Sequence, residues 1–178
     1  AIAAEKADEA AEFLKRLEVV GVGDKEVRAL RLHVNESVGQ QRFQFLQREL
    51  ETGKADEKML EELGDLCREQ DDLNAAVSYY QRAARQTPGN RVPVAKLAYC
   101  FARKRLFDLC GETMADLRLS LDNDPAELEQ LMIWIYRTGE ALEEARLFES
   151  AGKVFKQLMK IDAGYKDVLQ RVERLGRM

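Results

Sequence analysis

The feature that most constrains this chain is an internal repeat of small and large apolar residues. Within residues 57–90, a glycine is followed twelve residues later by an alanine and sixteen residues later by a tyrosine. The same small and large positions return 34 residues on, and again after a further 41 residues. The matched positions, in chain order, are Gly64, Ala76 and Tyr80, then Ala98, Cys110 and Met114, then Gly139, Ala151 and Phe155. A repeat of this length predicts a supersecondary unit that packs against its own copies.

The residues between the matched positions indicate that each unit is a pair of helices. The chain has only 3 Pro and 11 Gly, gathered at a few places, so long stretches carry no helix breaker. Paired helices can approach closely where a side chain is small, and this is the role we assign to the small positions. We expect the large position to fill the gap toward the next unit. The extra seven residues of the second interval are about two helical turns, which predicts a longer first helix from near Pro125. The turns within the units are expected at Asp71-Asp72, Lys104-Arg105 and Arg146.

At these residues the chain resembles the tetratricopeptide-repeat (TPR) family. The matching pattern in the first unit is Leu60-x2-Leu63-Gly64-x2-Cys67, then Ala76-x3-Tyr80, Ala83 and Pro88. Segments 91–124 and 125–163 match more loosely, and 164–178 resembles the helix that closes such arrays. The chain departs from the pattern at Cys67, where an aromatic residue is usual, at Thr138, where leucine is usual, and in having no proline that closes the second unit. The resemblance implies an all-α fold, an α-solenoid of about three TPR-like hairpins (57–90, 91–124 and 125–163) within residues 53–163, and a C-terminal capping helix at 164–178.

The first 52 residues lie outside the repeat. Residues 2–20 form an Ala-rich amphipathic pattern, and the glycines at 21 and 23 interrupt it. A long helix is predicted from 25 to 52, with Asp24 as its N-cap. Its apolar stripe consists of Val27, Leu30, Val34, Val38, Phe45 and Leu46. We expect residues 1–52 to form a helical hairpin that either caps the first repeat or makes a homodimer.

Charge and cysteine usage exclude several classes of protein. The formal net charge of −4 provides no general attraction to nucleic acid or to anionic membranes, although an acidic stretch (54–72) precedes a basic one (91–118). No apolar run approaches the roughly 20 residues of a membrane span, and no signal segment opens the chain, so we expect no membrane insertion. The chain begins with Ala1, which favours a segment processed or cut from a longer protein. The three cysteines are odd in number and lack CxxC spacing, which favours a reducing, cytoplasmic location.

No constellation of residues predicts catalysis. The one histidine, His33, has Ser37 and Glu36 as helix neighbours, but such neighbours cannot build the geometry of a catalytic triad. The cysteines lack zinc-ligand spacing and fall mostly on core positions of the repeats. Gly21-x-Gly23 lacks the Gly-Lys-Ser/Thr ending of a phosphate loop. We therefore expect no enzymatic activity, no cofactor and no metal.

The inner face of the first helices is the expected contact surface, because the resemblance implies that TPR arrays hold a partner segment there. The residues carried over as partner-binding are Arg68, Lys96, Tyr99, Arg103, Tyr136 and Arg137. This basic and aromatic strip suits a ligand with acidic and apolar side chains. Glu61 and Asp65 would repel a terminal carboxylate, which argues against the chaperone-binding branch of the family. Trp134 is expected in the core between the second and third units.

The sequence therefore predicts a non-catalytic scaffold that binds another protein or peptide through the concave groove. An alternative is an oligomerisation or signal-coupling module of a larger protein, acting through the N-terminal helices. Nucleic-acid binding through the basic triplet Arg103-Lys104-Arg105 is a second alternative, although an extended basic face is missing and no nucleic acid is expected as a partner.

Overall fold

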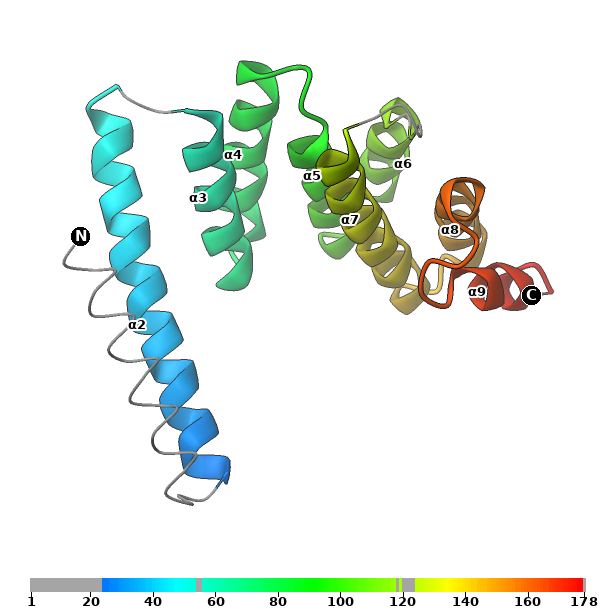
Figure 1. Cartoon of the computed structure of the whole chain (residues 1–178), viewed down its shortest axis with the longest axis horizontal. Helices are drawn as coiled ribbons and strands as arrows, with labels where there is room; N and C mark the ends of the chain where they lie inside the picture. The colour runs from blue at the N-terminus through cyan, green and yellow to red at the C-terminus, as the bar shows by residue number, and fades with distance from the viewer. Residues whose placement is uncertain (1–23, 54–55, 118, 120–123, 178) are drawn as a thin grey trace. The chain divides into compact units, whose positions relative to one another are not determined.

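A computed structural model describes residues 24–53, 56–117, 119 and 124–177, with side chains from residue 36 onward. Every regular element in these ranges is an α-helix, eight in all, and the described residues include no strand (Figure 1). The all-α class predicted from the sequence is confirmed. The helix predicted at 2–20 lies outside the described residues.

The chain divides into two compact units between Ala55 and Asp56. In the first unit, α2 (Asp24–Glu51) is a single helix of 28 residues. Leu46 of the predicted apolar stripe is buried, but Phe45 of the same stripe is 50% exposed. Adjacent residues of a helix point about 100° apart, so one helix face cannot bury both. The guanidinium carbon of Arg42 lies 5.5 Å from the centroid of the Phe45 ring.

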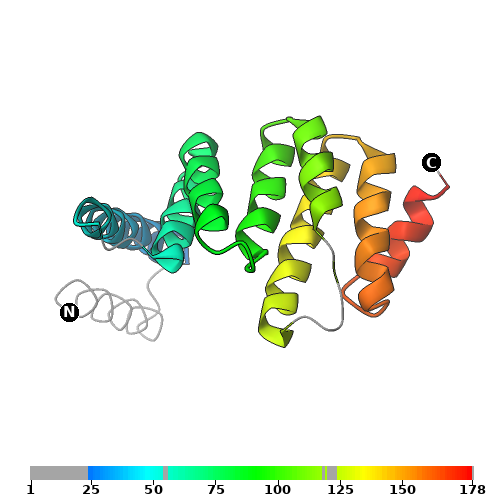
Figure 2. The ribbon, with the colours of Figure 1, turned by 90° about the horizontal axis from the view of Figure 1, so that it is seen from above.

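The second unit holds the other seven helices. They are α3 (Glu57–Glu69), α4 (Leu73–Gln86), α5 (Val92–Arg103), α6 (Phe107–Asp116), α7 (Pro125–Glu144), α8 (Phe148–Ile161) and α9 (Val168–Leu175). Helices α3 and α4, α5 and α6, and α7 and α8 pack as pairs, while α4 and α7 also contact α5, and α9 covers α8 (Figures 1 and 2). The longest of the seven, α7, begins at Pro125, as the sequence predicts.

Each pair is joined by the same tight turn. Asp71, Arg105 and Arg146 have φ angles of 60°, 61° and 63°, at equivalent places in the three pairs. The amide after each of them donates to a carbonyl oxygen five residues earlier, at 2.9 Å in every case. This arrangement is the Schellman motif, which ends a helix with one left-handed residue. The predicted turn positions are confirmed, and the three connections share one backbone geometry.

The small and large positions of the repeat meet within each pair. A Cβ atom added to Gly64 would lie 2.4 Å from Cε1 of Tyr80, and one added to Gly139 would lie 2.7 Å from Cε1 of Phe155. The expectation that these rings fill the gap toward the next unit is corrected, because each ring covers the glycine of its own pair. In the middle pair, Ala98 and Met114 stand at the same positions and are both buried. An unbranched, flexible Met leaves room for the extra methyl group of the alanine.

Other buried positions explain the departures from the family pattern. Thr138 is fully buried, and its hydroxyl donates to the carbonyl oxygen of Trp134 at 2.8 Å. A threonine is therefore tolerated in the core because its polar group is paired within its own helix. Cys67 is 3% exposed and Cys110 is 1% exposed, so both thiols pack as small apolar groups.

Candidate binding surface

Trp134 lies at the centre of the predicted strip. It is 5% exposed, which agrees with the predicted core position. Three cations surround its ring: the Arg68 and Arg137 guanidinium carbons lie 4.9 Å and 4.6 Å from the ring centroid, and Nζ of Lys96 lies 5.3 Å from it. Tyr99 approaches the same ring edge-on, with centroids 5.5 Å apart. Helices α3, α5 and α7 thus bring five of the predicted residues' neighbourhood together at one indole, where the ring quadrupole attracts the cations.

Lys96 is a correction to the predicted site. It was expected to contact a partner, but the residue is only 5% exposed. Its ammonium donates to Oε1 of Glu61 and to Oδ2 of Asp65, both at 2.6 Å. The two carboxylates that were expected to repel an acidic ligand are therefore neutralised within the protein. A buried, doubly paired lysine joins α5 to α3 and has no charge to spare for a ligand.

The same cluster orients Tyr80. Its hydroxyl donates to Oδ1 of Asp65 at 2.8 Å, so this carboxylate binds both Tyr80 and Lys96 through its two oxygens. Burial, followed by the negative charge of Asp65, raises the pKa of Tyr80 well above its usual range. The phenol therefore stays protonated and holds its ring over Gly64 at every physiological pH.

Tyr136 is the second correction. It is 5% exposed, and its ring packs edge-on against Phe155 and Tyr165. Its hydroxyl donates to Oδ1 of Asp167, at the start of α9. Burial, helped by this hydrogen bond, raises the pKa of Tyr136 to about 12. Tyr136 therefore secures α9 to α7 instead of facing a partner.

Arg171 of α9 completes that attachment. Its guanidinium donates to Oδ2 of Asp167 at 2.9 Å, to Oε2 of Glu143 at 2.8 Å and to Oε1 of Glu140 at 3.1 Å. Its guanidinium carbon lies 5.3 Å from the centroid of Phe155. Sequence analysis missed this residue. The signal was available, because Arg171 follows Lys96 by the same 75 residues that separate Glu140 from Asp65 and Phe155 from Tyr80.

The exposed remainder of the strip is a small hollow between α5 and α7. Tyr99, Arg103 and Arg137 line it with Glu140, Ala141 and Glu144, and it encloses about 200 Å³. Nη1 of Arg103 donates to the hydroxyl of Tyr99 at 3.1 Å, and its Nη2 lies 3.7 Å from Oδ1 of Asp71. Arg137 is exposed at the rim of the hollow while its guanidinium carbon lies over Trp134. The hollow can receive one side chain of a ligand.

Arg68 borders the strip from α3. Its side chain is 17% exposed, and Nη2 lies 3.3 Å from Oε1 of Glu69 and 3.7 Å from Oδ1 of Asp65. It supports the Trp134 ring from within the protein, and its charge is largely balanced. Of the six predicted partner-binding residues, the structure leaves three at the open surface: Tyr99, Arg103 and Arg137.

The three thiols are in the core of the second unit. Cys67, Cys100 and Cys110 are all free and buried. Burial raises the pKa of Cys67 to about 11, of Cys100 to about 12 and of Cys110 to about 11. Such thiols stay protonated near neutral pH and are poor nucleophiles. Among the described residues, no group of three or more His, Cys, Asp or Glu side chains is arranged to hold a metal ion.

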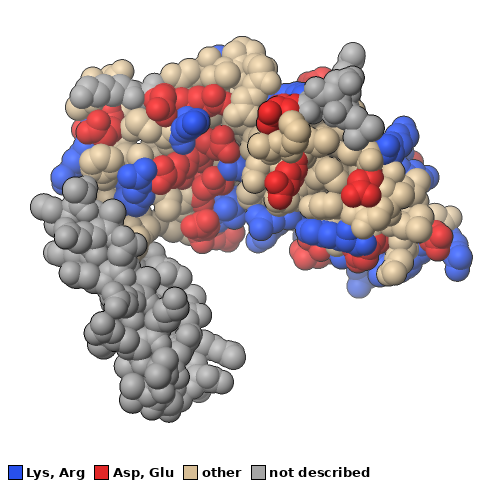
Figure 3. Space-filling model, viewed as in Figure 1, with Lys and Arg blue, Asp and Glu red and all other residues tan. Residues whose placement is uncertain are grey.

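The basic triplet is already engaged with other parts of the chain. Nζ of Lys104 donates to Oδ1 of Asn74, and Arg103 contacts Tyr99 and Asp71. Arg105 is the left-handed residue of its turn. On the face shown in Figure 3, acidic and basic side chains are interspersed over the described surface. This pattern differs from the continuous basic face that binds a phosphate backbone.

Comparisons with known proteins identify no relative. No family model matches the chain, and neither the curated proteins nor the solved structures include a match. The class that the structure defines is an all-α protein. In the ranges that the structure covers, no helix combines the length and apolarity needed to cross a bilayer.

Proposed function

We propose that this chain is a non-catalytic protein-interaction scaffold of the TPR type, in which three helix pairs form an α-solenoid closed by α9. Three observations support the proposal. The pairs share one turn geometry, each end pair stacks an aromatic ring on a glycine, and Lys96 and Arg171 make equivalent contacts back to the preceding first helix. Repeated contacts between successive units are what a stacked array requires.

The hollow formed by Tyr99, Arg103 and Arg137 is the observation that favours a binding role. Two arginines and a tyrosine surround it, and these are the residue types that dominate interface energetics. Glu140 is bound by Arg171, so the arginines face the unbound carboxylate of Glu144 alone among the lining acids. The partner is a peptide or helix that places an acidic side chain against Arg137 and an apolar one against Tyr99. Because the neighbouring rings are already packed, the site is formed before the ligand binds.

A selection experiment tests this role. A library of acidic and aromatic peptides is selected on the wild-type chain, and affinities are then measured for R103E and R137E. Each substitution should weaken the selected peptides by about tenfold or more, since it replaces an attractive charge with a repulsive one. The matched control is R85E, on the exposed surface of α4, which should leave the affinity unchanged. Equal binding by all four proteins would rule out this hollow as the contact surface.

The oligomerisation alternative has one observation of its own, the half-exposed ring of Phe45 on α2. A homodimer through residues 1–52 would cover this ring. Light scattering at several concentrations tests it: a dimer of the wild type that F45E converts to a monomer favours this alternative, and a wild-type monomer at all concentrations contradicts it. A cytoplasmic location remains part of the proposal and is supported by three buried, unpaired thiols.

A further inference from the structure

The last helix, α9, has the contacts of a first helix whose second helix is missing. Arg171 relates to Glu140 and Phe155 as Lys96 relates to Asp65 and Tyr80. In the preceding pairs, a second helix covers the first: α6 packs on α5, and α8 packs on α7. After α9 the described chain ends at Arg177 without a further helix. The face of α9 that a second helix would cover includes Leu169, which is 47% exposed.

An occupied version of this arrangement lies one step earlier in the fold. Between α6 and α8 is a narrow hollow of about 320 Å³. One wall is the α6 face with Phe107 and Gly111, and Leu142 of α7 also lines the hollow. The opposite wall is a helical stripe of α8: Ser150, Lys153, Val154 and Gln157. Here a second helix, α8, faces the second helix of the previous pair.

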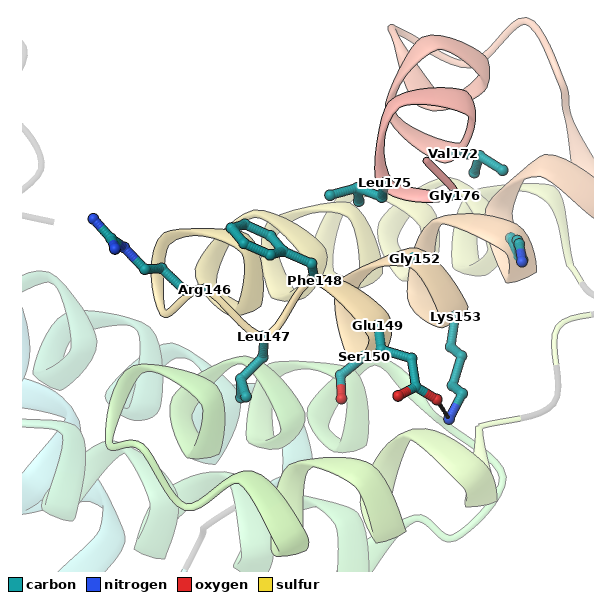
Figure 4. Close-up of a pocket in the computed structure, with 11 residues that line it drawn as sticks. Arg146, Leu147, Phe148, Glu149, Ser150, Gly152, Lys153, Val172, Leu175 and Gly176 are labelled. Atoms are coloured by element: carbon teal, nitrogen blue, oxygen red, sulfur yellow. Dashed lines mark ion pairs between the residues drawn. The ribbon is translucent and has the colours of Figure 1, made fainter. Parts of the chain in front are cut away.

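The hollow between α8 and α9 repeats two of these walls and lacks the opposing one. Phe148 and Gly152 of α8 stand 41 residues after Phe107 and Gly111, and Gly176 stands 34 residues after Leu142. Figure 4 shows Val172 and Leu175 of α9 on one side of α8, with the ion pair of Glu149 and Lys153 on the other. The volume is about 730 Å³, larger than that of the α6–α8 hollow, as expected where the third wall is absent.

The charges around the hollow specify what would fill it. Its lining has three cations, Arg146, Lys153 and Lys156, and one anion, Glu149. Glu149 is paired with Lys153 at 2.7 Å, which leaves the rim basic. Helix α6, on the other side of α8, has the opposite character, since its charged residues are Asp108, Glu112 and Asp116. A helix placed beside α8 from the α9 side would meet lysines, as α6 does.

We propose that the hollow between α8 and α9 binds one amphipathic helix of a partner protein, with small and apolar residues at i, i+3, i+4 and i+7 and glutamates beside them. The small residues would fit against Gly152, where a Cβ atom meets only Leu175 Cβ at 3.8 Å. The glutamates would face Lys156 and Arg146. This site is separate from the Tyr99–Arg137 hollow, and binding at one does not require the other.

The test uses the full chain and a fluorescent helical peptide of about 16 residues, long enough to form a helix alone. The peptide carries the Ser-Val-Gln stripe of α8 with glutamate at the flanking positions, and a second peptide has lysine at those positions. Affinities are measured by anisotropy for the wild type, G152Q and K156E. The matched controls are G111Q, on α6 with nothing within 4 Å of the added Cβ, and K160E, at an exposed position of α8 outside the hollow. A thermal melt of each variant reports its folding.

The glutamate peptide should bind the wild type at least tenfold more tightly than the lysine peptide. G152Q should weaken binding by about tenfold and K156E by about fivefold, corresponding to about 1 kcal/mol for an exposed charge pair. G111Q, K160E and R137E should bind as the wild type does. Equal affinity of the two peptides, no binding at about 1 mM, or binding that neither G152Q nor K156E weakens would overturn the proposal. A wild-type dimer that G152Q dissociates would also overturn it, because the hollow would then hold a second copy of the chain.

Discussion

The contact between Gly64 and Tyr80 predicts a specific rescue by a second substitution. In G64A, the added methyl carbon would lie 2.4 Å from the ring of Tyr80, where carbon atoms normally stay about 3.5–4 Å apart. The ring must shift by about 1 Å. It is fully buried and its hydroxyl is bound to Asp65, so it has no free direction in which to move.

The expected cost follows from two opposing effects. Overpacking of this kind destabilises by about 1–3 kcal/mol. Weakening the Tyr80 hydrogen bond adds about 1 kcal/mol, and the better helix propensity of alanine returns about 1 kcal/mol. We expect G64A to lower the free energy of unfolding by about 2 kcal/mol. The control G111A has nothing within 4 Å of its added Cβ and should raise stability by up to about 1 kcal/mol.

The middle helix pair suggests the rescue, because Ala98 and Met114 occupy the same two positions there. Y80M alone should destabilise, since it removes the buried ring and its hydrogen bond to Asp65. In the double variant G64A/Y80M, the alanine should cost less than it does beside tyrosine. Urea denaturation of the four proteins measures the coupling, which we expect to be about 1–2 kcal/mol in favour of the double variant. Additive effects within about 0.5 kcal/mol would show that the two side chains do not compete for one space.

Three further predictions concern α9, the thiols and Trp134. Hydrogen bonds from Tyr136 and Arg171 lower the pKa of Asp167, so its contribution to stability is present above the unfolded pKa of about 3.9 and is lost as pH falls through the lower folded value; melts between about pH 2 and 6 should show a steeper acid loss for the wild type than for D167N. R137A should uncover the indole that it now lies against, so acrylamide should quench Trp134 fluorescence more strongly than in the wild type, and unchanged quenching would contradict the stacking. A thiol reagent at pH 8 should react slowly with the native chain and rapidly in urea, and fast native labelling would contradict the burial of Cys67, Cys100 and Cys110.

The parts of the fold that the sequence predicted are those set by nearby residues. The turns at Asp71, Arg105 and Arg146 follow from where one apolar helical pattern ends and the next begins, within a few residues. The start of α7 follows from Pro125, which fits the first turn of a helix, and from Asp124, whose carboxylate accepts from the amides of the next turn. Small residues at fixed spacing predicted where the paired helices come close.

The site was predicted less well because its contacts join residues far apart in the chain. Lys96 is a helix residue of ordinary polar character until Glu61 and Asp65, some 31 to 35 residues earlier, are placed beside it. Tyr136 depends in the same way on Asp167, 31 residues later. Comparing charged positions between units, as was done for the apolar ones, would have matched Lys96 with Arg171. That match would have indicated structural ion pairs in place of ligand contacts.

The turns of this protein also bear on how similar helical arrays can be found in other sequences. Helices commonly stop at a glycine that adopts the left-handed conformation, and searches for helix ends rely on that residue. Here aspartate and arginine fill that place three times, with the same φ angle and the same pair of amide hydrogen bonds. A scan for glycine-marked helix ends would miss all three boundaries, whereas a scan of backbone angles would detect the period at once.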